Sequence, residues 1–237
     1  STDRAAYKMA DAMDADVLKY LSGYTTANAV NTTVNGTKAN AAAGTDELLA
    51  ANKLKKGDFT NITTTSAADH SIPLAPRLTG ATAVSAVAAT PLQVLARMSR
   101  RLDEQDVDTR GRWVVLDPVF IEMLKDEDSR VLNADFGGAG LMNGLLADNI
   151  HGFRVYQSNN LPSVGTGPGT GGTANQNINY GVIVAGHDSA VATAEQISKV
   201  EKYRDPDSFA DICRGMQLYG RKILRPEALI TAKFNAA

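Results

Sequence analysis

The stretch TPLQVLARMSRRLDEQDVDTRGRWVVLDPVFIEML, residues 90–124, predicts two helices with a strand between them. Its opening Thr-Pro is typical of an N-cap and a first helical turn, and apolar residues at helical spacing continue until near Gln105. The run RWVVL at 112–116 favours a strand, because β-branched and aromatic residues pack well on a pleated surface. The Asp-Pro pair that follows predicts the start of a second helix over 119–125.

Upstream of this stretch, residues 3–24 are predicted to form a long amphipathic helix. Apolar side chains recur every 3.6 residues or so from Ala6 to Tyr24 and make one stripe. Gly23 is a typical helix terminator. At about 1.5 Å per residue, this helix is about 33 Å long and could reach across a whole domain.

Residues 25–89 lie between these two regions and differ from both in composition. They are rich in alanine and threonine and lack long periodic runs, so we expect an irregular, largely surface insertion. The exception is 46–56, where Thr45 and Gly57 provide a cap and a stop for one short helix.

The C-terminal half predicts mainly short strands. Residues 152–157 and 181–185 favour strands, and the Gly-, Thr- and Asn-rich residues 163–179 predict a mobile loop. We expect a short helix capped by Asp188 or Ser189. The last stretch has strand-like runs with turn signals at Gly215, Gly220 and Pro226. Helices mixed with strands, without strict βαβ alternation, indicate an α+β fold.

Composition excludes several classes of protein. The chain has 237 residues, 43% of them apolar, and a net charge of -2, which excludes a wholly disordered protein. Its apolar runs are far shorter than the roughly 18 residues that a membrane span requires. The charge balance disfavours tight, sequence-independent binding of nucleic acid. Cys213 is the single cysteine, so no intrachain disulfide can form.

The known cofactor and metal motifs do not fit. The glycines of 138–144 are spaced GxGxxxG rather than GxGxxG, and 165–172 lacks the Gly-Lys-Ser/Thr ending of a phosphate loop. A calcium loop starting at Asp106 would place Arg110 where a ligand oxygen is needed. The three histidines are scattered. We therefore predict no cofactor and no metal.

One sequence of residues suggests catalysis. His187-Asp188-Ser189 contains the residue types of a hydrolase triad, with Ser189 as nucleophile and His187 as base. Neighbours in sequence rarely face one another in the required order, and the chain has no GxSxG motif. A cap at a turn is the simpler interpretation, and we predict that the chain is not an enzyme.

Several segments together resemble the major capsid proteins of tailed bacteriophages, especially those of short-tailed podoviruses. The C-terminal likeness lies in HDSAVAT at 187–193, the charged stretch to Arg204, Tyr219-Gly220 and LRPEA at 224–228. The region 90–124 supports it, and the helix over 3–24 resembles the spine helix of the HK97-like fold. The likeness covers residues 1–24 and 90–237.

The resemblance implies an α+β, HK97-like subunit with a peripheral and an axial domain. The implied divisions are a spine helix at 1–24, an insertion or loop region at 25–89, a peripheral helix and linker at 90–111, an axial domain at 112–194 and C-terminal peripheral strands at 195–237. The N-terminal arm and extended hairpin loop typical of the family have no counterpart here, so we expect a fragment or a processed chain.

The resemblance also implies contacts between subunits rather than a catalytic site. Residues 219–228 crowd basic, acidic and aromatic side chains into one turn, which indicates either a contact surface built from ion pairs or a solvated hairpin. The predicted subunit-contact residues are Arg97, Arg100, Arg101, Arg204, Asp205, Asp207, Arg214, Tyr219, Arg221, Arg225 and Glu227.

The function implied is that of a major capsid protein, a structural component of the virion. Copies would form pentamers and hexamers of an icosahedral shell, assembled in the host cytoplasm around double-stranded DNA without sequence-specific binding. Implied partners are scaffolding, portal and decoration proteins, with no membrane. The alternatives are an encapsulin-like shell for protein cargo, the hydrolase above, and a secreted adhesin.

Overall fold

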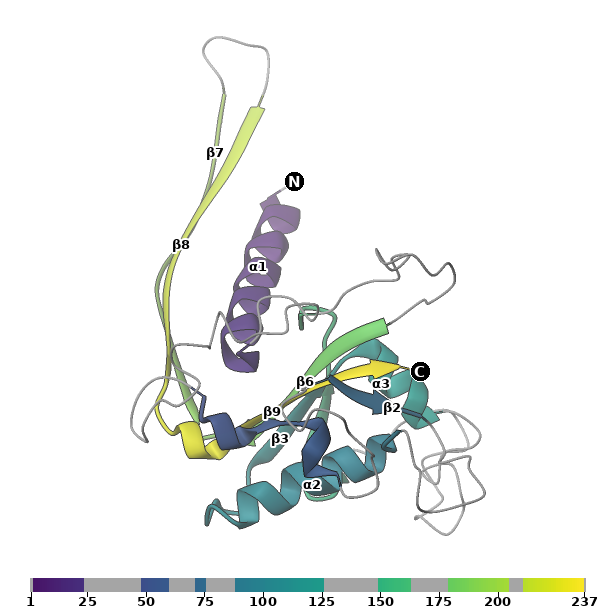
Figure 1. The fold of residues 1–237 in the computed structure, drawn as a ribbon. Helices are drawn as coiled ribbons and strands as arrows, with labels where there is room; N and C mark the ends of the chain where they lie inside the picture. Colours follow the sequence, from purple (N-terminus) through teal and green to yellow (C-terminus); the bar gives the residue numbers. More distant parts are fainter. Residues whose placement is uncertain are drawn as a thin grey trace.

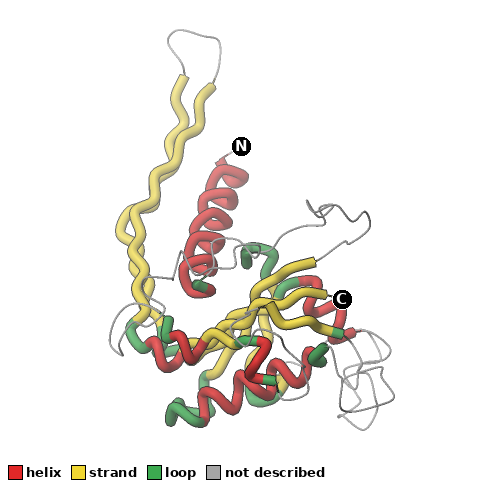
Figure 2. Tube along the Cα trace, in the orientation of Figure 1, coloured by secondary structure: helices red, strands yellow, loops and turns green. Residues whose placement is uncertain are grey.

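The computed structural model describes residues 2–23, 48–59, 71–75, 88–125, 149–162, 179–204 and 211–236. They form a mixed body, built on a seven-stranded sheet, and a two-stranded arm that projects from it (Figures 1 and 2). The helices are α1 (Thr2–Ser22), α2 (Pro91–Asp103) and α3 (Pro118–Lys125), with 3-10 turns at Ala50–Asn52, Lys56–Asp58 and Pro226–Ala228. The α+β fold class is therefore confirmed.

The sheet of the body combines parallel and antiparallel pairs. Its strands are β1 (Lys53–Leu54), β2 (Ser71–Leu74), β3 (Arg112–Leu116), β4 (Asn149–Ile150), β5 (Phe153–Gln157), β6 (Asn179–His187) and β9 (Leu229–Ala236). They run in the order β1-β9-β6-β3-β5-β4, and β2 also pairs with β9. The central pairs β9–β6 and β6–β3 are antiparallel, while β3–β5, β1–β9 and β2–β9 are parallel.

The main core lies between the sheet and α2 and α3. Leu95, Met98 and Leu102 are fully buried on α2, which has the helical spacing expected of its inner face. Phe120 of α3 meets Phe234 of β9 edge to face, with ring centroids 5.4 Å apart. Helix α1 lies on the other side of the sheet from α2 (Figure 1).

Most local predictions in the region 90–124 are confirmed. Thr90 accepts a hydrogen bond from the Gln93 N–H, and the Gln93 side chain accepts one from the Thr90 N–H, which caps α2 at the predicted residue. Strand β3 has the predicted bounds, and α1 ends at Gly23, whose φ of 69° favours glycine.

Three local predictions are wrong, each because tertiary pairing outweighs a local signal. The described part of 46–56 is not one helix, since Leu54 is fully buried in a strand beside β9. No helix follows Ser189, where a long strand, β7 (Val191–Arg204), begins. Gly215 and Gly220 are inside the continuous strand β8 (Asp211–Ile223) rather than at turns. Almost all of the predicted loop 163–179 falls outside the described residues.

A buried asparagine joins three separate segments of the body. Asn52 is fully buried, and its amide N–H groups reach the carbonyls of Pro226 and Leu229, both at 2.9 Å, and the side chain of Gln105. Gln105 in turn donates to Asn52 Oδ1. The amide thus connects the first 3-10 turn, the end of α2 and the turn before β9.

Replacing Asn52 by alanine is expected to lower the free energy of unfolding by about 2 kcal/mol, because two buried carbonyls lose their donor. Urea denaturation followed by circular dichroism measures the change. Asn160→Ala is the control, since that amide bonds the Asp11 carboxylate at a half-buried position and should matter less. Equal losses in the two variants would contradict the argument.

Asp117 is a buried carboxylic acid at the start of α3. Its Oδ1 accepts a hydrogen bond from the Val119 N–H at 2.9 Å, and burial raises the pKa of this carboxyl despite that bond. The folded state therefore binds the proton more tightly than the unfolded chain. The resulting stabilisation is fully present below the ordinary pKa of 3.8 and is lost as the pH rises through the raised pKa.

Asp117→Asn keeps the cap and removes the titration, so it isolates this effect. We expect the stability of the natural chain relative to this variant to fall as the pH rises from about 4 to about 7. Urea midpoints of both proteins across this range give the difference, in which other titrating groups cancel. A difference independent of pH would show that Asp117 does not titrate in this window.

Candidate subunit interface

The arm consists of β7 and β8, which pair antiparallel from Val191–Ile223 to Arg204–Asp211. At about 3.3 Å per residue, the 14 residues of β7 span about 45 Å, and most of this length projects beyond the body (Figure 1). A bulge between Glu195 and Ile197 breaks the register, and such bulges bend a strand pair. A long projecting hairpin offers two faces for contacts.

One face of the arm packs on α1. Because side chains alternate along a strand, Gly215, Tyr219 and Arg221 of β8 share this inner face. A Cβ atom on Gly215 would overlap the sulfur of Met9, so the helix approaches the strand closely where there is no side chain. The glycine inside β8 therefore marks a packing contact and not a turn.

Asp16 of α1 is the centre of the contact between α1 and the arm. Its carboxylate accepts a hydrogen bond from the Tyr219 hydroxyl at 2.7 Å and forms an ion pair with Arg221. Arg221 also donates to the Asp16 carbonyl at 2.9 Å, and its guanidinium lies 4.8 Å from the centre of the Tyr20 ring. These four residues, Asp16, Tyr20, Tyr219 and Arg221, are called the arm junction below.

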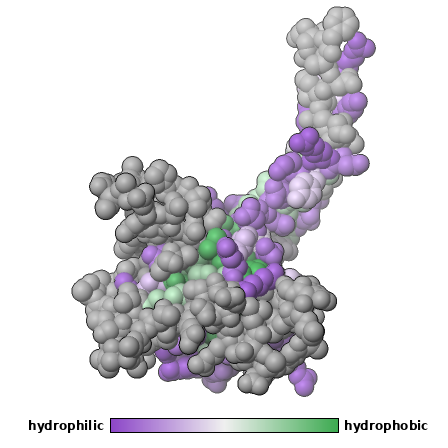
Figure 3. Space-filling model, turned by 90° about the vertical axis from the view of Figure 1, so that its right-hand side faces the viewer, coloured by the Kyte–Doolittle hydropathy of each residue, from purple (hydrophilic) through white to green (hydrophobic). Residues whose placement is uncertain are grey.

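The opposite, outward face of the arm carries exposed apolar side chains. Met216, Leu218 and Leu224 are 56%, 53% and 53% exposed, and Tyr203 on β7 is 43% exposed. Figure 3 shows mainly hydrophilic residues along the arm, with hydrophobic ones gathered where it meets the body. Several large apolar side chains exposed on one face of a hairpin and just beyond its end are typical of an interaction surface.

The structure uses several of the predicted contact residues inside the subunit. Tyr219 and Arg221 belong to the arm junction, and Arg225 pairs with Glu227 at 2.9 Å within one turn. Arg214 bonds Glu201 across the arm at 3.0 Å and lies over the Tyr203 ring. Whether these side chains also meet a neighbouring subunit stays a prediction.

The remaining predicted contact residues are in other places. On α2, Arg100 and Arg101 both pair with Glu104, Arg101 also pairs with Asp58, and Arg97 lies over the Phe59 ring. Arg204 is exposed at the far end of β7. Asp205 and Asp207 lie outside the described residues. The structure therefore does not gather the nine described residues of this set into one surface.

The candidate triad residues close the turn between β6 and β7. His187 Nδ1 is 2.8 Å from the Ser189 hydroxyl oxygen, and Nε2 is 2.8 Å from the Arg110 carbonyl. Since a carbonyl only accepts, Nε2 carries the proton. The Asp188 carboxylate instead binds Arg154 at 2.8 Å, so it does not orient the histidine. Contacts with each other, with Arg110 and with Arg154 account for all three side chains.

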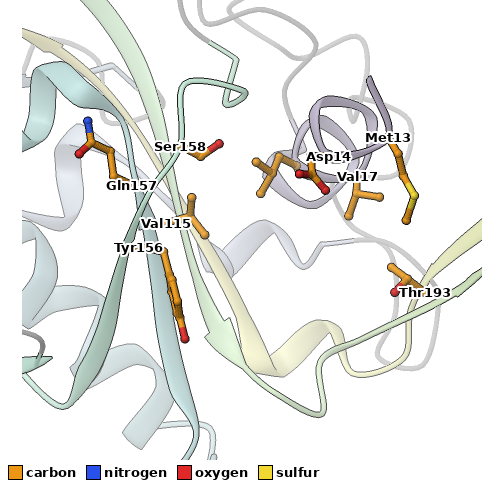
Figure 4. Close-up of a pocket in the computed structure, with 9 residues that line it drawn as sticks. Met13, Asp14, Val17, Val115, Tyr156, Gln157, Ser158 and Thr193 are labelled. Atoms are coloured by element: carbon orange, nitrogen blue, oxygen red, sulfur yellow. The ribbon is translucent and has the colours of Figure 1, made fainter. Parts of the chain in front are cut away.

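An open groove lies between α1, the sheet and the base of the arm. It is lined by Met13, Asp14, Val17 and Leu18 of α1, by Val115, Tyr156 and Gln157 of β3 and β5, by Ser158, and by Thr193 of β7 (Figure 4). It encloses about 410 Å³, and Tyr156 is 52% exposed there. Five of its nine lining residues are apolar or aromatic, and Asp14 supplies its one carboxylate.

Sequence reasoning missed Met216, Leu218 and Leu224 as candidate contact residues. The signal was present, because Met216, Leu218, Lys222 and Leu224 occupy alternate positions of MQLYGRKIL, residues 216–224, interrupted by Gly220. Treating Gly215 and Gly220 as turns divided this stretch and hid the alternation. Among the described residues, no group of three or more acidic, His or Cys side chains is placed to hold a metal ion. No described helix is both long and apolar enough to cross a membrane.

Comparison with solved structures finds phage structures that are similar to this chain. The chain is similar to a chain of Mycobacterium phage Che8, with 28% identity, a TM-score of 0.50, and coverage of 70% of this chain and 53% of that one. It resembles phage capsids in fold. The predicted resemblance to phage capsid proteins is thereby confirmed, while the podovirus-like and HK97-like details stay predictions.

Two further capsid structures are similar at lower scores. "Capsid structure of the Cyanophage P-SCSP1u" has 22% identity, a TM-score of 0.47, and 79% and 60% coverage of this chain and that one. "Asymmetric unit of bacteriophage PhiM1 mature capsid" has 18% identity, a TM-score of 0.44, and 60% and 46% coverage. The chain thus spans about half the length of the solved chains that it matches. No protein-family model and no curated protein matches it.

Proposed function

We propose that this chain is a major capsid subunit that self-assembles into an icosahedral shell around the double-stranded DNA of a tailed phage. The observation that carries the proposal is the braced arm. A hairpin about 45 Å long, held to α1 on one face and exposing apolar residues on the other, is suited to contacts with neighbouring copies. The fold likeness to the Che8 chain supports it.

The near-neutral charge of the chain fits a container whose DNA is not held by the coat. A net charge of -2 provides no excess of cations to neutralise phosphates. Copies would associate as pentamers and hexamers through head-to-tail contacts, which close into rings when the rotation between copies allows it. Scaffolding, portal and decoration proteins, and assembly in the host cytoplasm, belong to the same proposal.

Electron microscopy of the protein expressed from its gene together with a scaffolding partner tests the proposal. We expect uniform closed shells, and nuclease-protected DNA inside particles isolated from virions. Shells that hold protein cargo and no DNA would favour the encapsulin-like alternative. A monomer or dimer at high concentration would contradict the shell, and a loss of esterase activity in Ser189→Ala would then favour the hydrolase.

A further inference from the structure

The proposed capsid role leaves open which surfaces of neighbouring copies meet. Two apolar surfaces of the described chain have no partner within it. The first is the outward face of the arm, with Met216, Leu218 and Leu224 exposed. The second is the groove between α1 and β5, with Val17, Val115 and Tyr156 in its walls. Each exposes several large apolar side chains, as contact sites do.

The two surfaces face different sides of the subunit. Asp14 lines the groove together with Thr193 of β7, which pairs with Arg221 across the arm, so the groove lies on the inner side of the arm. The outward face of β8 in turn points away from α1, because its inner face carries Tyr219 and Arg221. The two surfaces therefore cannot cover each other in one chain.

The two surfaces also carry complementary charges. Lys222 shares the outward face of β8 with Leu218 and is exposed, and among the described residues it forms no ion pair. Asp14 is exposed at the groove and likewise forms no ion pair with a described residue. Tyr7, two helical turns before Asp14 on the same side of α1, is 67% exposed and extends the apolar wall. A basic apolar ridge thus matches an acidic apolar groove.

We propose that the outward face of the arm of one copy docks in the groove of the next copy, with Lys222 facing Asp14. This inference rests on the proposed capsid function and specifies its interface. The contact is head-to-tail, because each copy offers one ridge and one groove on different sides. Burial of Leu218 and Leu224 against Val17 and Tyr156 supplies apolar stabilisation, and the charge pair sets the register.

Site-directed cross-linking in assembled particles tests the contact. In a Cys213→Ser background, one preparation carries only Leu218→Cys and another only Tyr156→Cys, and a short bis-maleimide is added after assembly. We expect each preparation alone to remain monomeric on a denaturing gel, and shells assembled from an equal mixture to give a covalent dimer. Glu122→Cys, exposed on α3, replaces Tyr156→Cys in the matched control and should give none.

The possible outcomes distinguish the head-to-tail contact from the capsid proposal on which it rests. A dimer from Leu218→Cys alone would show that two arms meet face to face and would overturn the head-to-tail contact. Shells without any cross-link would overturn the contact while the capsid proposal stands. If the natural sequence forms no shells, the capsid proposal fails and this inference fails with it.

A charge swap provides a second, independent readout. Asp14→Lys is expected to lower the yield of assembled particles about tenfold, because it places two cations in the contact. Adding Lys222→Asp should restore most of the yield. Sedimentation separates shells from free subunits. A failure of the second substitution to restore assembly, with both chains folded by circular dichroism, would refute the pairing of these residues.

Discussion

Replacing Arg112 by alanine is expected to lower the free energy of unfolding by about 4 kcal/mol, the largest stability effect of any substitution considered for this chain. The Arg112 side chain is 2% exposed. It donates to the Val107 carbonyl at 2.6 Å, to the Asp108 carbonyl at 2.8 Å and to Asp103 at 2.7 Å. One guanidinium thus holds the whole loop between α2 and β3.

The loss of stability arises mainly from the buried carbonyl that the substitution leaves without a hydrogen-bond donor. The Val107 bond is fully buried, so its carbonyl would lose a donor that water cannot easily replace. Asp103 is 55% exposed and remains solvated, so the lost ion pair contributes less. Arg112→Lys should recover only part of the loss, since an ammonium group cannot reproduce the planar fork of donors.

Urea denaturation of the purified variants measures this effect. Arg100→Ala is the matched control, because Arg100 pairs with Glu104 on the surface of α2 at 63% exposure and should change the stability by less than about 1 kcal/mol. Similar midpoints for Arg112→Ala and the natural chain would refute the structural role. The comparison separates the buried arginine from the general loss of a positive charge.

Asp16→Arg is expected to abolish shell assembly while the body stays folded. The substitution replaces an ion pair with two adjacent guanidinium groups and removes the acceptor of the Tyr219 hydroxyl. Because Asp16 and Arg221 are both partly exposed, the effect on unfolding of the body should be small. The orientation of the arm relative to α1 should change, and a closed shell tolerates little variation in that angle.

Two measurements report on the effect of the substitution at the arm junction. Sedimentation gives the yield of particles, which we expect to fall at least about tenfold. Limited proteolysis reports on the arm without reference to assembly, and cleavage in β7 or β8 should become faster. The double variant Asp16→Arg with Arg221→Asp reverses the pair and should restore much of the assembly, although it loses the contact with Tyr20.

A control on the same helix guards against a general effect of charge. Lys8→Ala removes the exposed pair with Asp11, where Lys8 is 67% exposed, and should leave both assembly and proteolysis unchanged. If Asp16→Arg assembles normally and its arm resists proteolysis like the natural chain, the arm junction does not fix the orientation of the arm relative to α1.

Much of the fold can be predicted from the sequence where an element depends on residues close to it along the chain. Local side chains determine the cap of α2 at Thr90, the bounds of β3 and the end of α1 at Gly23. These features can therefore be predicted without tertiary information. The same reasoning failed at Gly215. A glycine permits both a turn and a close approach, and only the position of Met9 decides between them.

The candidate interface was predictable only in part for the same reason. Charge and aromatic content marked Tyr219 and Arg221 as contact-forming residues, but the partner of both is Asp16, more than 200 positions away in the chain. The exposed apolar side chains of Met216 and Leu218 became meaningful once β8 was known to be continuous, since alternation then assigns them to the outward face.

The sequence by itself determined the α+β class, the local elements from Thr90 to Lys125 and the long helix α1, because periodicity, caps and strand propensity act over a few residues. Only the tertiary structure decided that β7 and β8 form one continuous arm and that Asp16 anchors it. The first feature depends on the hydrogen-bond ladder between β7 and β8, which outweighs the local turn preference of glycine, and the second on a contact between segments more than 200 positions apart.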